Sequence, residues 1–346
     1  MIDILRGTLG KILDHAEHDD PRGASWEQLR QAGLLTPFQQ GLSSWSEGAE
    51  LIRCASERAV AIPFTEQLMA SYVAAQLGIA MDDQLVTLAD PRASDLVVGE
   101  SGVRGQANFV PHAAVAAQLW VEAYSEERRR ELVLMEIRGV EARAGLNLAY
   151  EPRDALSIAG APVCFRMQTS GEVSELFFLG ALGRSVQIAA LAEQVLASCL
   201  EHAQTRVQFG RSIGTFQAVQ HKLAELACEV AAANLAVDVA CAALDAHGLL
   251  AITGAGQAIA AAKLQAGTTA RRAAEVGHAV HAAIGFTREH RLHRYTQRLL
   301  SYRAEFGPER VFALFLGARA RRGGAEGLWS GLVEADPGTH PVAGAK

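Results

Sequence analysis

The sequence predicts a mainly α-helical chain with a β-domain at its centre. Helical periodicity dominates the first 84 residues and returns from about residue 174, whereas short apolar runs alternate with Gly, Asp and Pro in between. A length of 346 residues is enough for two or three domains, and the 49% of apolar residues can form sizeable cores. We therefore expect an N-terminal helical domain (1–84), a middle β-domain (85–170), a four-helix bundle (171–322) and a loose tail (323–346).

The composition argues against several classes of protein. The net charge of −6 comes without a basic stripe, which argues against a nucleic-acid partner. The five cysteines are scattered without a C-x-x-C pair, which fits reduced thiols and gives no metal-site spacing. No apolar run approaches the ~20 residues that span a bilayer, and the N-terminus lacks a signal-peptide core. We expect a soluble, cytoplasmic protein that binds no metal, membrane or nucleic acid.

The N-terminal helices have readable starts and stops. Ser25-Trp26-Glu27-Gln28 has the pattern of a capping box, and Gly33 can end the helix that it opens. Two Ala-rich periodic segments follow, Gly48 to Val60 and Thr65 to Leu77. Pro63 separates them, because the residue before a proline is disfavoured in a helix.

The middle of the chain reads as short strands at the regular spacing of an all-β domain. The candidate strands are Leu85–Leu88, Leu96–Val98, Val103–Val110, Ala117–Ala123 and Glu131–Ile137.

Four long helical segments follow. They are Phe178 to Val207, Thr215 to Leu244, Gly254 to Ala283, and Arg288 to Leu316. Alanine stripes such as Ala231–Ala233 and Ala260–Ala262 allow helices to approach closely, which favours a four-helix bundle.

The stretch from Arg206 to Glu225 joins the first two of these helices. Its first part is polar, with glycines at Gly210 and Gly214, and Thr215 can cap the helix that follows. A guanidinium beside a helix N-terminus is a natural anion site. A well-capped turn with a solvated arginine explains the same pattern, and spacing alone leaves both interpretations open.

This stretch resembles the signature of the acyl-CoA dehydrogenase family, R-x-Q-F-G-x-x-I-x-x-F-Q-x-x-Q-x-x-L-A. Every specified position is present from Arg206 to Ala224, and the resemblance extends over about Phe177 to Arg319. It is weaker and shorter before that, where the N-terminal domain looks trimmed and the middle domain degenerate. The resemblance implies the family's fold, an N-terminal helical domain, a small β-barrel or sandwich and a C-terminal four-helix bundle. It also implies an FAD flavoprotein.

The resemblance assigns cofactor contacts to two segments. Arg206, Gln208, Phe209 and Gly210 would contact FAD, the arginine pairing with the pyrophosphate of a cofactor held mainly by the neighbouring subunit, and Gln217 is a weaker candidate. The second segment, Ala279 to Thr287, is similar to the family's Q-V-H-G-G-x-G-F-T.

This second segment departs from the family pattern at three positions. Ala279 replaces Gln, and Ala282 and Ala283 replace two glycines that let the pyrophosphate approach backbone N–H groups. We expect the two methyl groups to obstruct or shift the cofactor. His281 stays as a polar candidate, although a lone His beside a helix end is more often structural.

The family's middle domain has a flavin-contacting motif, T-E-P-x-x-G-S-D. Ala89 to Asp95 resembles this motif only weakly and echoes it at a few positions. That segment is otherwise a turn.

Glu305 is the candidate catalytic base. Removing an α-proton from a thioester needs a carboxylate in an apolar pocket, where burial raises its pKa. In the family the base commonly lies in a Y-E-G-T turn, and Ser301 to Gly307 supplies a Glu there with the aromatic residue and Gly displaced. The stretch Leu179 to Arg184, where another branch of the family has its base, contains no acid. The alternative is a surface Glu whose pKa is lowered by Arg303 and Arg310.

Three functions fit these residues. The first is an FAD-dependent acyl-CoA dehydrogenase, in which Glu305 takes the Cα proton, the Cβ hydride passes to flavin N5, and an electron-transfer flavoprotein accepts the electrons. It would be a homodimer or homotetramer. The second is a non-catalytic or half-site subunit of a heteromeric dehydrogenase, and the third is a flavin monooxygenase or oxidase on the same fold.

Overall fold

The N-terminal part of the protein is helical, as the sequence predicts. The computed structural model describes residues 1–16 and 24–333. This part contains α1 (Ile2–Leu13), α2 (Ala24–Gln31), the 3-10 turn η1 (Pro37–Gln39), α3 (Trp45–Glu57) and α4 (Phe64–Gln76). Ser44 caps α3 by accepting a hydrogen bond from the backbone N–H of Glu47, and Pro63 separates α3 from α4.

The middle of the chain forms one eight-stranded sheet. Its order is β6-β7-β3-β2-β4-β5-β8, and β1 pairs with β4 off this path. Both β1 and β2 run parallel to β4, and the other pairs are antiparallel. The strands are β1 (Val86–Leu88), β2 (Ser94–Gly99), β3 (Gly102–Pro111), β4 (Gln118–Ser125), β5 (Arg130–Glu136), β6 (Glu141–Arg143), β7 (Arg153–Ala161) and β8 (Val163–Gln168), with 3-10 turns η2 (Pro91–Ala93) and η3 (Ala113–Val115) between them.

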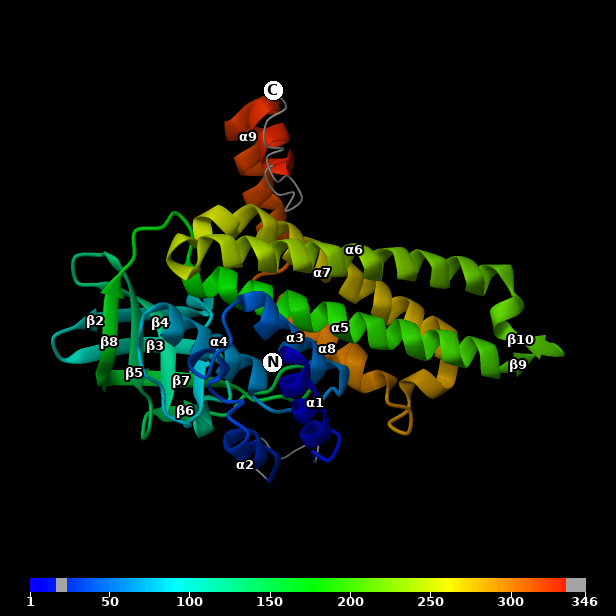
Figure 1. The fold of residues 1–346 in the computed structure, drawn as a ribbon, viewed down its shortest axis with the longest axis horizontal. Helices are drawn as coiled ribbons and strands as arrows, with labels where there is room; N and C mark the ends of the chain where they lie inside the picture. Colours follow the sequence, from blue (N-terminus) through cyan, green and yellow to red (C-terminus); the bar gives the residue numbers. More distant parts are fainter. Residues whose placement is uncertain (17–23, 334–346) are drawn as a thin grey trace.

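The C-terminal part is a bundle of long helices. It contains α5 (Glu175–Thr205), α6 (Gln217–His247), α7 (Ile252–His281) and α8 (Leu292–Ala304), with 3-10 turns η4 (Ile213–Thr215), η5 (Leu249–Ala251) and η6 (Ala282–Phe286). A two-stranded hairpin, β9 (Val207–Gln208) and β10 (Arg211–Ser212), connects α5 to α6. Figure 1 shows the sheet at one end of the bundle and this hairpin at the other. The predicted mainly helical fold with a central β-domain is thereby confirmed.

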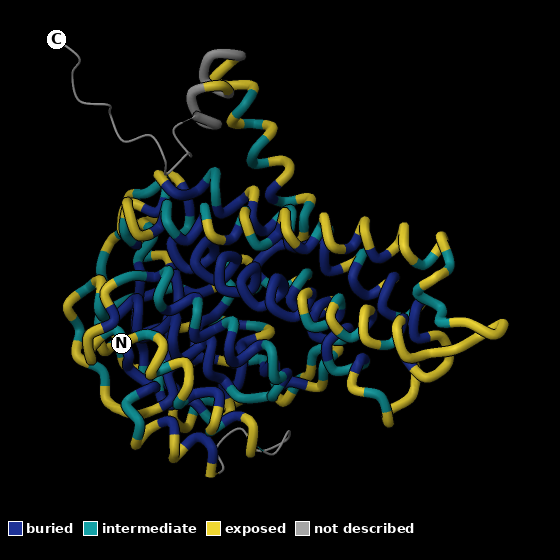
Figure 2. Tube along the Cα trace, turned by 45° about the vertical axis from the view of Figure 1, so that its right-hand side comes forward, coloured by how far each residue is buried: buried dark blue, intermediate teal, exposed yellow. Residues whose placement is uncertain are grey.

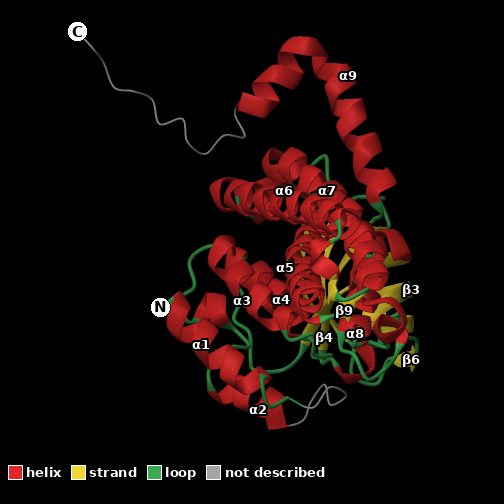
Figure 3. Cartoon of the chain, turned by 90° about the vertical axis from the view of Figure 1, so that its right-hand side faces the viewer, coloured by secondary structure: helices red, strands yellow, loops and turns green. Residues whose placement is uncertain are grey.

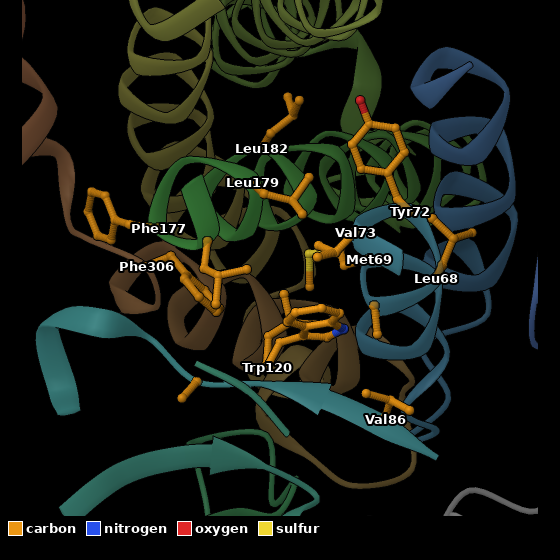
Figure 4. Close-up of a cluster of buried hydrophobic side chains, with 14 of the residues drawn as sticks. Leu68, Met69, Tyr72, Val73, Val86, Trp120, Phe177, Leu179, Leu182 and Phe306 are labelled. Carbon is orange, nitrogen blue, oxygen red and sulfur yellow. The ribbon is translucent and has the colours of Figure 1, made fainter. Parts of the chain in front are cut away.

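One hydrophobic core joins the three parts. Trp120 of β4 lies below Leu179 and Leu182 of α5, and Leu68 and Met69 approach from α4 (Figure 4). The first half of α5 is buried on all sides, whereas the outer sides of α6 and the hairpin are exposed (Figure 2). The site described below therefore lies where helices and sheet meet around α5.

The expected fourth helix is two helices. The sequence predicts one segment from Arg288 to Leu316, but α8 ends at Ala304 and α9 (Glu309–Val333) begins after a turn. Gly307 has φ +92°, and an added Cβ would lie 2.8 Å from the ring of Phe177. Pro308 then precedes the first residue of α9, a position that suits proline.

The expected loose tail is helical in its first part. Helix α9 continues to Val333 across a non-helical Gly324, and it stands away from the bundle (Figure 3). No proline interrupts the stretch before Pro337, so glycines kink the helix without ending it. Residues 334–346, the rest of that tail, lie outside the described residues.

Within residues 1–16 and 24–333, two helices, α5 and α6, have the length and composition that could cross a membrane, contrary to the expectation that no run is long enough. The apolar window of α5 is entirely buried inside the protein, as in the core helix of a soluble protein. The most apolar 18-residue stretch of α6 is only 33% buried.

Candidate functional site

Glu305 lies in the turn between α8 and α9. It ends α8 in an extended conformation, and Phe306 and Gly307 follow with positive φ values of 49° and 92°. The ring of Phe306 packs directly on Gly180 of α5, where an added Cβ would lie 2.2 Å from it. Gly180 and Gly307 thus hold the turn against α5, close to Phe177 (Figure 4).

The carboxylate of Glu305 is held by two arginines and an amide. Arg153 of β7 donates from Nε to Oε1 at 2.8 Å and from Nη2 to Oε2 at 3.1 Å. Arg184 Nε lies 2.8 Å from Oε2, and Asn147 Nδ2 donates to Oε1 at 3.2 Å. Both oxygens of Glu305 are therefore occupied, and the side chain is only 17% exposed.

The expectation that burial raises the pKa of Glu305 is wrong. Burial is the largest single influence and by itself raises the pKa, but the attraction of Arg153 and Arg184 and the hydrogen bonds from Arg153 and Asn147 lower it to about 2. The alternative was a surface Glu whose pKa is lowered by Arg303 and Arg310. The pKa is lowered, but these two arginines are not the cause. Arg303 instead forms an ion pair with Glu309.

The two arginines belong to a larger buried network. Arg184 pairs with Glu66 of α4 at 2.6 Å, and Arg153 pairs with Glu151 at 3.2 Å. Arg298 Nε and the hydroxyl of Tyr302 both donate to Glu151 Oε1, at 2.9 and 2.8 Å. Three carboxylates balance three guanidinium groups, so each buried charge has a partner of opposite sign.

Little space is left inside this network. The cavity lined by Glu66, His112, Glu151 and Arg298 has a volume of about 20 Å³, which is room for about one water molecule. An acyl chain does not fit there.

A second cavity lies on the other side of Glu305. It has a volume of about 430 Å³ and is mainly apolar, with Phe109, Leu146, Leu148 and Leu300 in its wall. Glu305 and Asp90, from the echoed segment Ala89 to Asp95, also line it. The structure therefore brings that segment to the Glu305 cavity.

The residues of the signature lie at the opposite end of the bundle. Arg206 ends α5, and its backbone N–H donates to the carbonyl of His202. Gln208 is in β9, while Phe209 and Gly210 form the hairpin tip with φ values of +51° and +77°. Arg206 and Gln208 are exposed, and Phe209 is 91% exposed. These residues are exposed to solvent in the single chain, and Figure 1 shows their hairpin at the end of the bundle away from the sheet.

The helix after the hairpin starts differently from the expectation. Thr215 is not its cap: its hydroxyl donates to the carbonyl of Ser212, and Phe216 occupies the N-cap position of α6 without a side-chain hydrogen bond. The hydroxyl of Ser212 instead caps the 3-10 turn through Gly214 N–H. Gln217 is the first residue of α6 and is part of the same end of the bundle.

The His281 segment lies at this same end. The ring of His281 is stacked on that of His202 with 4.6 Å between centroids. His281 is 2% exposed, with Nδ1 2.9 Å from the carbonyl of Gly277 and Nε2 3.1 Å from Ser198 Oγ. Both ring nitrogens are engaged inside the chain, which favours the structural role.

Ala282 and Ala283 have exposed methyl groups. Ala282 adopts φ 51° and ψ −135°, a conformation that glycine reaches far more easily than alanine. The backbone thus has the shape expected of the family's glycine, although the residue is alanine.

Sequence reasoning missed the partners of Glu305. The stretch Leu179 to Arg184 contains no acid, but its Arg184 is fully buried and lies 2.8 Å from Glu305. An arginine inside an otherwise apolar helix was the available signal, because a buried charge requires a partner. Arg153 and Asn147 gave no comparable signal.

Comparisons with known proteins concern the C-terminal half of the sequence and the fold. Residues 173–320 match the family model described as "Acyl-CoA dehydrogenase, C-terminal domain". The acyl-CoA dehydrogenase IpdE2 of Mycobacterium tuberculosis is 41% identical over 112 residues, which cover 32% of this chain and 32% of that relative. The matched region thus spans about a third of that relative's length.

Solved structures extend the likeness to nearly the whole chain. The ChsE4-ChsE5 complex from Mycobacterium tuberculosis has a TM-score of 0.79 at 21% identity, covering 94% of this chain and 98% of that chain. A variant of the Tcur3481-Tcur3483 steroid ACAD has a TM-score of 0.80 at 20% identity, covering 93% and 98%. At these identities the likeness establishes a shared fold.

Proposed function

We propose that this chain is a half-site subunit of a heteromeric, FAD-dependent acyl-CoA dehydrogenase. The premise is that the chain belongs to the acyl-CoA dehydrogenase family by its C-terminal domain and its fold. The assembly would introduce a double bond between Cα and Cβ of an acyl-CoA thioester. The partner chain would supply the catalytic base, and this chain would supply its bundle and its hairpin.

The observation that carries this proposal is the state of Glu305. A base must offer a lone pair to the α-proton, and both oxygens of Glu305 already receive hydrogen bonds or ion pairs. A carboxylate with a pKa of about 2 is also a weak acceptor for a proton on carbon. The network therefore disfavours proton abstraction by this chain.

The register of the turn supports the same conclusion. If Gly307, with its positive φ, is the glycine of the family's Y-E-G-T turn, the Glu position falls on Phe306 and the Tyr position on Glu305. Phe306 is buried and has no acid–base group.

The hairpin residues fit the phosphate side of a cofactor held by a neighbouring chain. Arg206 and Gln208 are exposed hydrogen-bond donors. The ring of Phe209, at the tip of the hairpin, is also exposed in the single chain. FAD would supply the hydride acceptor of the reaction. Arg206 would bind and orient its pyrophosphate through charge-assisted hydrogen bonds. The names of two solved structures, each of a pair of chains, suit a heteromeric assembly.

The second candidate function is a single-chain acyl-CoA dehydrogenase with Glu305 as base. It is favoured by the apolar cavity of about 430 Å³, because Glu305 lies in its wall and an acyl chain could enter. Substrate binding would then have to displace Arg153 or Arg184 from the carboxylate. No observation favours the monooxygenase or oxidase alternative.

The remaining expectations follow from the same premise. An electron-transfer flavoprotein would reoxidise the flavin of the assembly, and the protein would be located in the cytoplasm. The five cysteines are unpaired, as expected in a reducing compartment.

Anaerobic bleaching of bound flavin by a panel of acyl-CoA thioesters, from short chains to steroid-sized ones, tests the proposal. The chain is purified alone and after co-expression with candidate homologous chains. We expect bleaching only from the co-expressed assembly. Full flavin content and bleaching by the chain alone would favour the single-chain enzyme.

A further inference from the structure

A cluster of histidines lies at the hairpin end of the bundle and has no role in the function proposed above. His281, the last residue of α7, is its centre and is only 2% exposed. Its ring is stacked on that of His202 of α5 and is tilted by 53° against that of His290, in the segment before α8, with 4.6 Å between centroids in each case. His278, one turn earlier on α7, completes the cluster, and its Nε2 lies 3.1 Å from Thr296 Oγ1 of α8. The cluster thus joins α5, α7 and the segment before α8.

The hydrogen bonds of these rings require neutral imidazoles. The carbonyl oxygen of Gly277 lies 2.9 Å from His281 Nδ1, so this nitrogen carries the proton, and Nε2 is left to accept from Ser198 Oγ at 3.1 Å. His290 Nδ1 accepts from the backbone N–H of Leu292, the first residue of α8, at 3.2 Å. A proton on His290 Nδ1 would remove this acceptor and leave a donor at the start of the helix unpaired.

The surroundings oppose a positive charge on the cluster. Burial lowers the pKa of His202, and His290 and Arg206 lower it further. Burial is also the largest influence on His281, whose pKa is lowered further by the neighbouring imidazoles, although its hydrogen bond to a backbone carbonyl works in the opposite direction. From α8, His293 adds another imidazole, with Nδ1 2.8 Å from the carbonyl oxygen of His290.

No carboxylate neutralises the cluster within residues 1–16 and 24–333. Glu201 and Glu289, each next in sequence to a histidine of the cluster, are exposed, and neither forms an ion pair with these rings. Cys199 Sγ lies 3.9 Å from His281 Nδ1, but burial raises the pKa of this thiol to about 12, so it stays neutral. Protonated rings would therefore face one another and Arg206 without compensation.

We propose that this cluster is a pH-sensitive switch, in which neutral histidines hold the segment from Ala282 to Arg291 against α5 and α7, and protonation releases it. Like charges at ring-stacking distance repel one another, and the acceptor nitrogens of His281 and His290 are lost in the same step. The stabilisation is complete above about pH 6.5, the ordinary pKa of histidine, and is lost as the pH falls below it, because the open state binds the protons first. The switch belongs to this chain itself, whichever chain supplies the catalytic base.

Hydrogen–deuterium exchange of the full chain between pH 7.5 and pH 5.5 tests the proposal, with rates corrected for the pH dependence of chemical exchange. We expect the amides from Ala282 to Leu292 to lose about 10-fold of their protection at pH 5.5. This is the factor for one histidine that takes up its proton only in the open state, one pH unit below its ordinary pKa. The amides of α4 serve as the control and should keep their protection.

Non-titrating variants separate the histidines from the rest of the chain. The side-chain amide of asparagine lies where Nδ1 of histidine lies, so His281→Asn keeps a donor for Gly277 and His290→Asn keeps an acceptor for Leu292. The double variant should keep its protection at pH 7.5 and lose most of the acid-induced exchange. His221→Asn, an exposed change on α6, should behave as wild type.

Two results would overturn the proposal. The first is a wild-type chain that keeps the protection of Ala282 to Leu292 at pH 5.5. The second is a double variant that loses this protection on acidification as wild type does. If the double variant does not fold, His290→Asn alone is compared with wild type and must show less acid-induced exchange.

Discussion

At Glu305 the effect of burial depends on which charges are buried with the carboxylate. An apolar pocket alone would raise its pKa, and this is the usual route to a catalytic carboxylate. Here Arg153 and Arg184 are buried beside it and favour the ionised form. The carboxylate therefore stabilises the junction between β7, α5 and the turn after α8 as an anion.

This role predicts a particular dependence of stability on pH. The pKa of Glu305 is lowered from 4.5 to about 2 on folding, so its contribution is fully present above about pH 4.5. It is lost as the pH falls from 4.5 toward 2, because the unfolded chain binds the proton first. We expect Glu305→Gln to lower the free energy of unfolding at pH 7 by about 3 kcal/mol, since one partner of a buried ion pair is removed.

Urea unfolding of wild type and variant between pH 7 and pH 3 measures this effect. The difference between the two proteins should shrink as the pH falls below about 4.5. Glu126→Gln, which removes an exposed carboxylate near Arg104, is the control and should leave the pH dependence unchanged. A constant difference across the range would mean that Glu305 is not held as an anion.

The sequence identified Glu305 but could not identify what surrounds it. A Glu followed by an aromatic residue and Gly, and its likeness to the family's Y-E-G-T turn, pointed to this residue. Arg153 is 152 residues away along the chain and Arg184 lies on another helix, so only the folded sheet and bundle bring them together. The direction of a pKa shift depends on such long-range contacts.

At the scale of elements, the sequence predicted a turn between α5 and α6, and the structure has a two-stranded hairpin there. A continuous motif fixes its local conformation, with Phe209 and Gly210 supplying the positive φ values that a two-residue turn requires. The break between α8 and α9 was missed, although Gly307 and Pro308 were visible in the sequence. Helical periodicity resumes after them and concealed the turn.

The exposed position of Arg206 gives a prediction for this element. Arg206→Ala should weaken flavin retention by one to two decades in Kd, because a charge-assisted hydrogen bond to phosphate contributes about 1.5–3 kcal/mol. Folding should be unaffected, since the side chain is exposed and is not part of a core. Flavin absorbance per chain after dialysis and a thermal melt check both statements. Unchanged retention would remove Arg206 from the cofactor site.

At the scale of the whole molecule, α6 presents an apolar surface that this chain does not cover. Ala227, Ala231 and Leu235 follow one another at a spacing of four and are exposed, Leu235 by 66%. The most apolar 18-residue stretch of α6 is only 33% buried. Exposed apolar surface of this extent marks an interface with another chain.

We therefore expect association at micromolar concentration through α6. Leu235→Lys should weaken it at least ~10-fold, because a charge would be buried in an apolar contact. Sedimentation velocity measures the distribution of species, and Lys222→Ala, an exposed change on the same helix, is the control. A wild-type chain that sediments as a monomer, both alone and with its partner chain, would contradict this.

The central claim is that Glu305 stabilises this chain and is not the base of the reaction. The most direct measurement is the rate of anaerobic flavin reduction by an active acyl-CoA in the assembly containing Glu305→Gln, below the unfolding temperature of the variant. We expect a rate within about twofold of wild type, since the base would lie on the partner chain. A fall of about 10²–10⁴-fold, with flavin content and folding retained, would show that Glu305 is the base and contradict the account.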